Sequence, residues 1–403
     1  MNGSAKYIMK IITETIDASQ TSEHPYPFAY LSQKKEDILF LDIETTGLSA
    51  KTSSLYLIGC AFYMDGTWQL RQWFADQHSQ EQDLLSALIS FAHSFHTLIH
   101  FNGNRFDLPY LQAKCNQYAL PYPFADYVSI DIYKRVAPYK NLLGLPDCKQ
   151  KTIELFLGID REDIYNGGQL ITVYKDYLAN PCEEVYRLLT LHNADDVRGM
   201  FRLLPILAYY DFFQNIRNLP PLQLSCDNIS SETDIDSVLP IRALKVQANF
   251  YNDYSGIRRQ ELFMKLSLQT ALPVPIGSNV DGCFFQLDKN TGTLRVPLVE
   301  DELKYFYSNY KDYYYLPEED QAIHKSVAEF VDRAYRMQAS ASNCYTRKPG
   351  QFLREWDLVF TPFFKKEYKS SELYFELTDT FKKNRTAMSL YAIHILGHIF
   401  ESV

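Results

Sequence analysis

The first clear apolar pattern along the chain begins after Asp37. Residues 38–41 form a short apolar run bounded by charged positions, which is typical of a buried strand. Residues 55–63 and 68–74 are also rich in apolar side chains, and the Asp-Gly pair at 65–66 between them favours a hairpin turn. The pattern therefore predicts three consecutive strands of antiparallel type.

Helical and strand-like periods alternate after these three segments. Leucine and isoleucine recur at helical spacing over residues 81–95, and residues 97–101 again form an apolar strand. The remaining segments are a helix at 106–116, a strand at 127–132, and helices at 149–157 and 183–209. Strands followed by helices indicate a mixed α/β sheet with helices on its faces.

Four regions follow from the patterning. Residues 1–35 are a polar N-terminal extension with one short helix expected near residues 6–16, and residues 36–212 form the α/β domain. Residues 213–240 contain a Pro-Pro pair among polar positions and are predicted to be a linker. Residues 241–403 are predicted to be an α+β domain, with hairpin turns near 288–292 and 348–350 and a helix over 321–337.

Charge and composition restrict the classes of function. The chain has 40 Lys and Arg against 49 Asp and Glu, a formal net charge of −9. Any contact with nucleic acid must therefore depend on a local cationic patch or on bound metal. The seven cysteines never form a CxxC pair, which argues against a zinc site and a disulfide framework. No signal-peptide pattern or apolar run of about 20 residues is visible, so a cytoplasmic protein is expected.

Two acidic residues lie at the end of the first predicted strand. Side chains alternate along a strand, so Asp42 and Glu44 share one face. Two neighbouring carboxylates repel each other and favour a hard divalent cation such as Mg²⁺ or Mn²⁺. The alternative is that the strand has already ended and both acids face water.

A third acid lies where the strand at 97–101 gives way to a helix. Asp107 in the segment 102–109 could serve as another carboxylate ligand. An Asp at this position could instead cap the helix, and Pro109 suits a first helical turn.

The last long helix carries a fourth acid beside a histidine. His192 and Asp196 are four residues apart and share a helix face. Asp196 could complete a metal site, and His192 could act as a general base. Asp195 is the alternative ligand, Asn193 could add a hydrogen bond, and a solvated acidic pair beside a surface histidine remains the simpler interpretation.

Together these segments resemble the DEDD exonucleases of the ribonuclease-H-like superfamily, and more closely the YprB-like branch of predicted exonucleases. The resemblance covers residues 36–210 and rests on three motifs: Asp42-Ile43-Glu44-Thr45-Thr46-Gly47, Asn102-Gly103-Asn104-Arg105-Phe106-Asp107 and His192 to Asp196. Further segments that resemble the YprB-like branch are Asp131-Ile132-Tyr133, Lys151-Thr152-Ile153-Glu154 and Arg161-Glu162-Asp163-Ile164. The third motif departs from the family, where it reads Tyr-x3-Asp or His-x4-Asp: here the spacing follows the first form and the histidine follows the second.

The resemblance implies a ribonuclease-H-like fold and a 3′–5′ exonuclease that uses two Mg²⁺ or Mn²⁺ ions. Asp42 is expected to bridge both ions, Glu44 and Asp196 to complete the first, and Asp107 to hold the second. His192 would orient or deprotonate the attacking water. The partner would be nucleic acid, most readily a single-stranded 3′ end, and the expected substrate-binding residues are Thr45, Leu48, Asn102 and Phe106.

Several positions carry weaker expectations. Asp131 and Glu154 could support the metal ligands, although Asp131 could equally cap a helix. Lys149 and Lys151 could contact phosphate or simply be solvated. The tyrosine-rich stretch 305–315 could stack on bases, with nearby cationic clusters, or pack in a core. A structure-selective endonuclease and a non-catalytic binding module of the same fold remain alternative functions.

Overall fold

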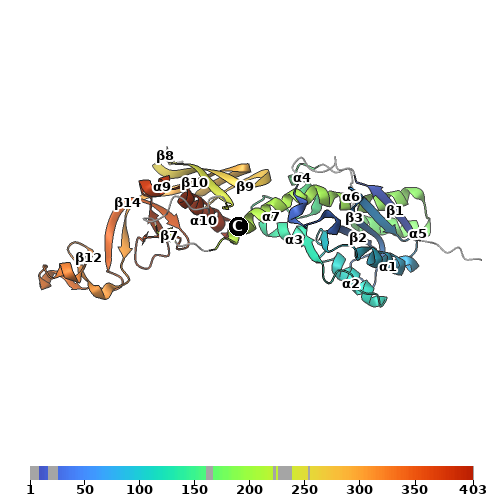
Figure 1. Cartoon of the computed structure of the whole chain (residues 1–403), viewed down its shortest axis with the longest axis horizontal. Helices are drawn as coiled ribbons and strands as arrows, with labels where there is room; N and C mark the ends of the chain where they lie inside the picture. Colours follow the sequence, from blue (N-terminus) through green and yellow to red (C-terminus); the bar gives the residue numbers. More distant parts are fainter. Residues whose placement is uncertain are drawn as a thin grey trace, which may run out of the picture. The chain divides into compact units, whose positions relative to one another are not determined.

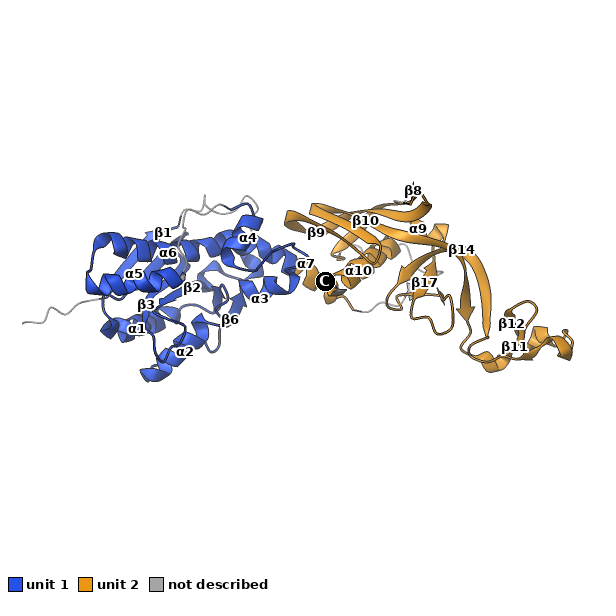
Figure 2. Ribbon diagram, turned by 180° about the vertical axis from the view of Figure 1, so that it is seen from behind, with its two compact units in different colours: residues 1–210 blue, residues 211–403 orange. Residues whose placement is uncertain are grey.

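The chain forms two compact units, residues 1–210 and 211–403 (Figure 2). This computed structural model describes residues 9–16, 26–159, 167–220, 224–225, 238–252 and 255–402. The boundary between the units falls inside helix α7 (Leu207–Arg217), so residues 213–217 of the predicted linker are helical. Most of that linker, residues 221–223 and 226–237, lies outside the described residues. No helix in the described part is both long and apolar enough to cross a membrane.

The first unit contains a six-stranded mixed sheet in the order β1-β4-β3-β2-β5-β6 (Figure 1). β2 pairs antiparallel with β3 and parallel with β5, so the switch from antiparallel to parallel pairing occurs at β2. The strands are β1 (Lys10–Thr15), β2 (Ile38–Thr45), β3 (Leu55–Met64), β4 (Thr67–Phe74), β5 (Thr97–His100) and β6 (Val128–Asp131). Five of them confirm the predicted strands.

Helices flank this sheet (Figure 1). Those of the first unit are α1 (Glu81–Ala92), α2 (Asp107–Gln117), α3 (Ile132–Val136), α4 (Gln150–Phe156), α5 (Gly167–Ala179) and α6 (Glu183–Leu203). Alternation along β2 assigns its two faces: Phe40 stacks on Phe201 of α6, whereas Leu41 belongs to the core cluster shared with Leu84 of α1. The predicted mixed α/β sheet with flanking helices is therefore confirmed.

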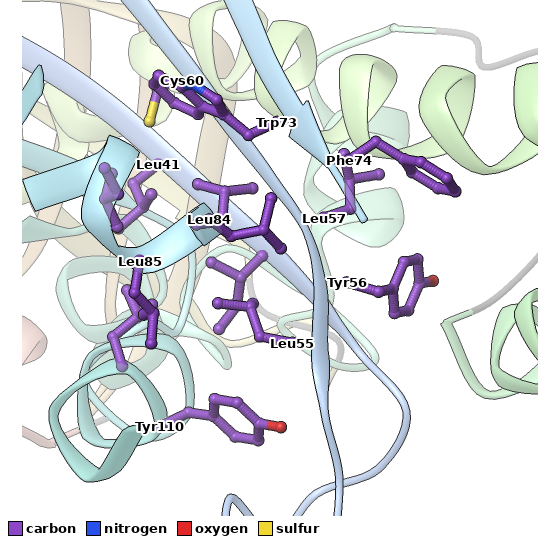
Figure 3. Packing of buried hydrophobic residues seen from close by; sticks show 14 of the residues in the cluster. Leu41, Leu55, Tyr56, Leu57, Cys60, Trp73, Phe74, Leu84, Leu85 and Tyr110 are labelled. Carbon is purple, nitrogen blue, oxygen red and sulfur yellow. The ribbon is translucent and has the colours of Figure 1, made fainter. Parts of the chain in front are cut away.

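The core of the first unit is built from large apolar and aromatic side chains (Figure 3). Leu57 and Phe74 from the central strands are fully buried together with Leu85 of α1. Tyr56 stacks on Tyr174 of α5 with ring centroids 3.9 Å apart, which fastens α5 to the sheet. A rigid sheet supported in this way holds the end of β2, where the acidic motif lies.

The helix expected near residues 6–16 is wrong for the described residues, because Lys10–Thr15 form the edge strand β1. β1 pairs antiparallel with β4, and Ile12 lies opposite Gln72. The Lys10 ammonium reaches Asp76 at 3.0 Å and lies 4.1 Å from the ring centroid of Tyr186. Pairing with a distant strand overrode the weak local helical pattern.

The second unit combines sheets with helices, as the predicted α+β class requires, and most of it is β-sheet. Its main sheet has the order β16-β17-β14-β10-β9-β8, and a three-stranded sheet has the order β12-β11-β13. The strands are β7 (Leu224–Ser225), β8 (Ile241–Asn252), β9 (Arg258–Val280), β10 (Cys283–Phe306), β11 (Tyr313–Leu316), β12 (Gln321–His324), β13 (Met337–Gln338), β14 (Tyr345–Glu355), β15 (Phe360–Thr361), β16 (Phe363–Phe364) and β17 (Leu373–Glu376). The helices are α8 (Lys325–Ala328), α9 (Asp379–Lys383) and α10 (Arg385–Ser402).

Three local predictions in this unit are wrong. The two expected hairpins are single strands, because residues 288–292 form a bulged bend inside β10 and residues 348–350 lie within β14. The helix expected over 321–337 is divided among β12, the short α8 and β13. Residues that favour turns lie inside long strands here, because the neighbouring strands supply hydrogen-bond partners for their backbone.

The tyrosine-rich stretch packs against itself. Tyr307 stacks on Tyr313 with centroids 4.4 Å apart, beside the buried Cys344. The nearby cations are matched by acids: Lys304 lies 2.8 Å from Glu367, and equivalent pairs are Lys325–Asp312, Arg347–Glu302 and Lys348–Glu376. These contacts favour packing over base stacking for this segment.

Candidate active site

Two elements bring the acidic motif residues together. Glu44 at the end of β2 and the pair His192 and Asp196 on α6 each offer a ligand atom, and these atoms lie within 4.8 Å of one another. His192 Nε2 lies 3.3 Å from Asp196 Oδ2 and 3.7 Å from Glu44 Oε1. Glu44 and His192 are buried and Asp196 is partly exposed, so the cluster opens to solvent on the side of Asp196. Two carboxylates and an imidazole are a donor set that suits a divalent metal ion.

Asp42 lies beside this cluster and is held by α6. The Asn193 amide donates to Asp42 Oδ2 at 2.8 Å, and its oxygen accepts from Gln72 Nε2 at 2.8 Å. Gln72 also donates to the Thr190 carbonyl at 2.8 Å. These bonds fix the Asn193 amide orientation and hence the position of the Asp42 carboxylate.

Gly59 gives Asn193 the space it occupies. Gly59 is the β3 partner of Asp42, and a Cβ atom there would lie 2.1 Å from Asn193 Oδ1. Any side chain at this position would displace the asparagine. The hydrogen-bonded chain Gln72–Asn193–Asp42 therefore requires glycine at one point of β3.

Asp107 approaches the same region from the start of α2. Its Oδ1 accepts a hydrogen bond from the Ile43 backbone N–H at 3.3 Å, between Asp42 and Glu44. Burial raises the pKa of Asp107 to about 7, with a contribution from the negative charges of Asp131 and Asp196 and opposition from backbone hydrogen bonds. The structure thus brings Asp107 to the β2 motif, as a site of this kind requires.

Burial also raises the pKa of Asp42 well above its ordinary value. Repulsion by Asp196, Glu44 and Asp107 raises it further, and the hydrogen bond from Asn193 lowers it. Within the described residues, no Lys or Arg lies within ion-pair distance of Asp42 or Asp107. The site therefore concentrates carboxylates without a protein cation to neutralise these two.

Asp131 is a cap rather than a member of the acidic cluster. Its carboxylate accepts from the backbone N–H groups of Asn102, Asn104 and Lys134 at 2.9, 3.2 and 3.2 Å. These bonds shape the loop before Asp107, where Asn102 has a left-handed φ of 60°. Asp131 thereby positions the second motif.

His100 completes the support of that loop. The ring is fully buried, and burial lowers its pKa to about 4 despite the nearby Asp131 carboxylate. Its Nδ1 accepts the Gly103 N–H at 3.1 Å, and its Nε2 lies 2.8 Å from Ser129 Oγ. A neutral imidazole is therefore part of the structural frame.

The four expected substrate-binding residues lie in or next to the first two motifs, and they differ in exposure and in hydrogen bonding. Leu48 is 87% exposed, and Phe106 is half-buried at the start of α2. The Thr45 hydroxyl is already used, since it donates to the Gly47 carbonyl at 2.9 Å. The Asn102 Oδ1 is buried and accepts no hydrogen bond from the described residues. Their roles in binding stay predictions.

The remaining candidate residues also differ in their contacts and in their exposure. Asp195 lies 3.3 Å from Arg198 Nη1, whereas its neighbour Asp196 turns towards His192. Glu154 on α4 is buried and accepts from Gln150, which also donates to the Asp196 carbonyl. Lys149 is highly exposed and its Nζ lies 3.6 Å from Asp147.

Gln72 and Gly59 were not predicted as site residues. Both lie in strands whose alternation is unremarkable, and neither residue type suggests chemistry by itself. Gly59 and Gln72 are register partners on β3 and β4, and only their contacts with α6 show that they support Asn193. The one available signal was Gln72 itself, a polar residue at an alternate position of β4 where the other residues are apolar.

Residues 39–208 match the family model of the RNase H superfamily. The match covers strands β2 to β6, helices α1 to α6 and all five proposed catalytic residues. The first unit is therefore RNase H-like in fold, which supports a nuclease. No curated protein sequence matches the chain.

Solved structures share parts of the chain at low identity. A family B DNA polymerase from Pyrobaculum calidifontis is 17% identical over 44% of this chain and 25% of its own, with a TM-score of 0.36. Product-bound exonuclease I is 12% identical over 63% of this chain and 59% of its own, with a TM-score of 0.31. Brucella melitensis NrnC with bound Mg²⁺ is 15% identical over 46% of this chain and 89% of its own, with a TM-score of 0.23. The chain thus spans less than two thirds of the first two proteins.

Proposed function

We propose that the first unit is a divalent-metal-dependent 3′–5′ exonuclease that hydrolyses phosphodiester bonds of DNA or RNA. The observation that carries the proposal is the convergence of Glu44, His192 and Asp196 within 4.8 Å, next to Asp42 and Asp107. The match to the RNase H superfamily supports the same class of chemistry.

The residues present fit Mg²⁺ or Mn²⁺. Hard divalent ions favour oxygen ligands, and four carboxylates gather here with one imidazole. The raised pKa values of Asp42 and Asp107 show that the carboxylates are desolvated without enough positive charge to balance them. A divalent ion would remove that imbalance.

Asp42, Glu44, Asp107 and Asp196 would hold two such ions. When bound, the ions neutralise phosphate charge and make a coordinated water more acidic. Asn193 keeps the Asp42 carboxylate in one orientation through its 2.8 Å hydrogen bond. The side chains are thus placed before substrate arrives, which lowers the cost of organising the transition state.

His192 would handle the proton of the attacking water. Its Nε2 lies 3.3 Å from Asp196 and 3.7 Å from Glu44, so the imidazole lies beside carboxylates that would hold the ions. The same position would also let His192 act as a ligand. In either role the His192 imidazole would contact the attacking water or the metal ion.

The end of the nucleic acid strand would lie against apolar side chains. Leu48 projects into solvent after the first motif, and Phe106 precedes Asp107. Apolar contact with the terminal sugar and base would place the last phosphodiester at the carboxylates. Thr45 and Asn102 would add polar contacts from the two motif loops.

The test replaces Asp42 with alanine and follows digestion of a single-stranded oligonucleotide with Mn²⁺. The parent should release mononucleotides from a 3′ label at once and give a shortening ladder from a 5′ label. The Asp42→Ala protein should lose at least about a hundredfold in rate, because the change removes one ligand and the hydrogen bond that Asn193 donates to it. Asp126→Ala, an exposed carboxylate of the same unit, is the matched control.

Equal digestion by Asp42→Ala and the parent would refute the assignment. A circular single strand separates exonuclease from endonuclease, because it has no 3′ end. Cutting of the circle at a rate comparable to the linear strand would replace the exonuclease proposal with an endonuclease of the same fold. Metal-independent binding without any hydrolysis would indicate a non-catalytic module.

A further inference from the structure

The three long strands β8, β9 and β10 in the second unit have one buried and one open face. Ile241 and Ala243 of β8 point to the buried face, as do Leu266 of β9 and Leu294 of β10. Helix α10 packs against this side, where the Ala243 N–H donates to Ser389 Oγ at 2.9 Å. The residues between these buried positions therefore line the opposite, solvent-facing side.

Four cations gather on that open face, which we call the cationic face: Arg242, Lys245, Lys265 and Arg295. All four are exposed. Lys245 lies directly opposite Lys265 in the β8–β9 register, and Arg295 is two residues beyond Thr293, the β10 partner of Lys265. The cluster therefore crosses three neighbouring strands.

These cations are weakly compensated. Arg295 Nε reaches Glu261 at 4.0 Å. Across the portion of the chain the structure describes, no carboxylate lies within ion-pair distance of Arg242, Lys245 or Lys265. The chain as a whole has a net charge of −9, so a local positive patch is not a consequence of its composition.

The opposed lysines need an explanation. Like charges directly opposite each other in a sheet are destabilising. A lysine on an edge strand can protect against edge-to-edge association, which would account for Lys245 on β8. It does not account for Lys265 and Arg295, because β9 and β10 are interior strands.

Aromatic side chains lie among the cations. Phe263 is half-buried and is the register partner of Gln247 on β8 and Arg295 on β10. The Arg295 guanidinium lies 5.5 Å from the ring centroid of Phe284. Proteins that bind single-stranded nucleic acid combine cations for the phosphates with aromatic rings for the bases.

We propose that the cationic face binds the phosphate backbone of single-stranded nucleic acid. The inference rests on the proposed function, since it names a second surface for the same class of substrate. Phosphates placed between Lys245 and Lys265 would convert their repulsion into attraction. The bases of the strand would lie near Phe263 and Phe284.

The experiment measures binding of a fluorescein-labelled 30-nucleotide single strand by anisotropy, with the full chain carrying Asp42→Ala and with EDTA present. The Lys245→Glu/Lys265→Glu variant should bind at least tenfold more weakly at low salt. The slope of log affinity against log salt should fall by about 1.4, or about 0.7 for each lost phosphate contact with a single strand. The matched control, Lys325→Glu/Lys348→Glu, has the same net charge but alters lysines paired with Asp312 and Glu376.

A neutral variant separates binding from folding. Lys245→Gln/Lys265→Gln removes the repulsion between the two side chains, so it should unfold at the same or a higher temperature while still binding more weakly. A purely structural role would instead lower the unfolding temperature. The proposal is overturned if the face and control variants bind alike, if binding stays at the parental level, or if a duplex of equal length binds as tightly as the single strand.

The two proposals fail separately. If the native chain binds single strands through the cationic face but never cuts them with Mn²⁺, the nuclease assignment fails and the cationic face stands. If the native chain cuts single strands and the face variants bind them as well as the parent, only the cationic face is refuted.

Discussion

At the scale of single residues, the site depends on how one asparagine is held. Asn193 is fully buried, donates to Asp42 and accepts from Gln72. The side chains that hold metal ligands commonly influence metal affinity and activity as much as tenfold to a hundredfold. Gln72 acts only through Asn193, so the two should behave as one unit.

We expect Asn193→Ala to lower activity about tenfold to a hundredfold and to raise the Mn²⁺ concentration needed for half-maximal rate, because Asp42 loses its 2.8 Å hydrogen bond. Gln72→Leu should have a smaller effect. The double variant should be no worse than Asn193→Ala alone, as measured by a double-mutant cycle on kcat and on metal dependence. Fully additive losses would show that Gln72 does not work through Asn193.

Asp107 should make stability depend on pH when divalent ions are absent. Its pKa is about 7 in the folded protein against about 3.9 in an unfolded chain, so ionisation disfavours the fold. The associated stability is present at low pH and is lost as the pH rises from about 4 towards 7, by up to a few kcal/mol. Denaturant unfolding in EDTA should show this loss in the parent.

Asp107→Asn isolates that contribution from other titrating groups. His100 has a lowered pKa and acts in the opposite sense, losing stability as the pH falls from about 6.5 towards 4. The difference between the parent and Asp107→Asn should therefore grow from pH 5 to pH 8 in favour of the variant. Parallel curves over this range would contradict the raised pKa.

At the scale of elements, Tyr174 is one of the buried residues that pack α5 against the sheet. Tyr174 is fully buried, stacks on Tyr56 at 3.9 Å and donates its hydroxyl to the Ala75 carbonyl at 2.9 Å. Tyr174 thus contacts both β3 and the segment that follows β4.

Tyr174→Ala should lower the free energy of unfolding by about 3–5 kcal/mol, because it removes a large buried ring and leaves a cavity. Tyr174→Phe keeps the ring and should cost only about 1 kcal/mol for the lost hydrogen bond. Tyr30→Ala, a residue that is 66% exposed, should change little. Urea denaturation checks all three, and equal losses for the Ala and Phe variants at position 174 would show that the stacking contributes nothing.

The elements also show where local patterns predict well. In the first unit, five strands were predictable because each is an apolar run closed by polar residues, as in β2. In the second unit, the segment from Asp288 to Gly292 favoured a turn. It lies inside β10 instead, because β9 pairs with β10 before and after the irregularity there. The local sequence of β10 does not contain the information that β9 continues to pair with it through this irregularity.

At the scale of the whole molecule, two compact units share one chain, and among the residues that the structure describes the candidate metal site lies in the first. A ligand that binds one folded unit stabilises that unit alone. The two units should therefore respond differently to divalent ions.

Mn²⁺ should stabilise the first unit by about 2.7 kcal/mol at a hundredfold excess over its dissociation constant. In a Trp356→Phe variant the two remaining tryptophans, Trp68 and Trp73, both belong to the first unit, so their fluorescence reports its unfolding. The same titration with Asp42→Ala added should give a smaller shift. An equal shift in both proteins would mean that Mn²⁺ binds elsewhere.

The sequence by itself determined five strands of the first unit, β2 to β6, its helices α1, α2, α4 and α6, and the order in which the acids occur. Apolar periods set these elements locally, and the spacing of Asp42, Glu44 and the pair on α6 fixes which side chains share a face. Such information needs only near neighbours in the chain.

The tertiary structure alone decided which of these side chains meet. It joined β1 to the sheet, brought the pair on α6 next to Glu44, and used Asp131 as a cap. It also placed Gln72 and Asn193, 121 positions apart, in hydrogen-bond contact, with Gly59 providing the space. These outcomes depend on register and packing between distant segments, which no local pattern encodes.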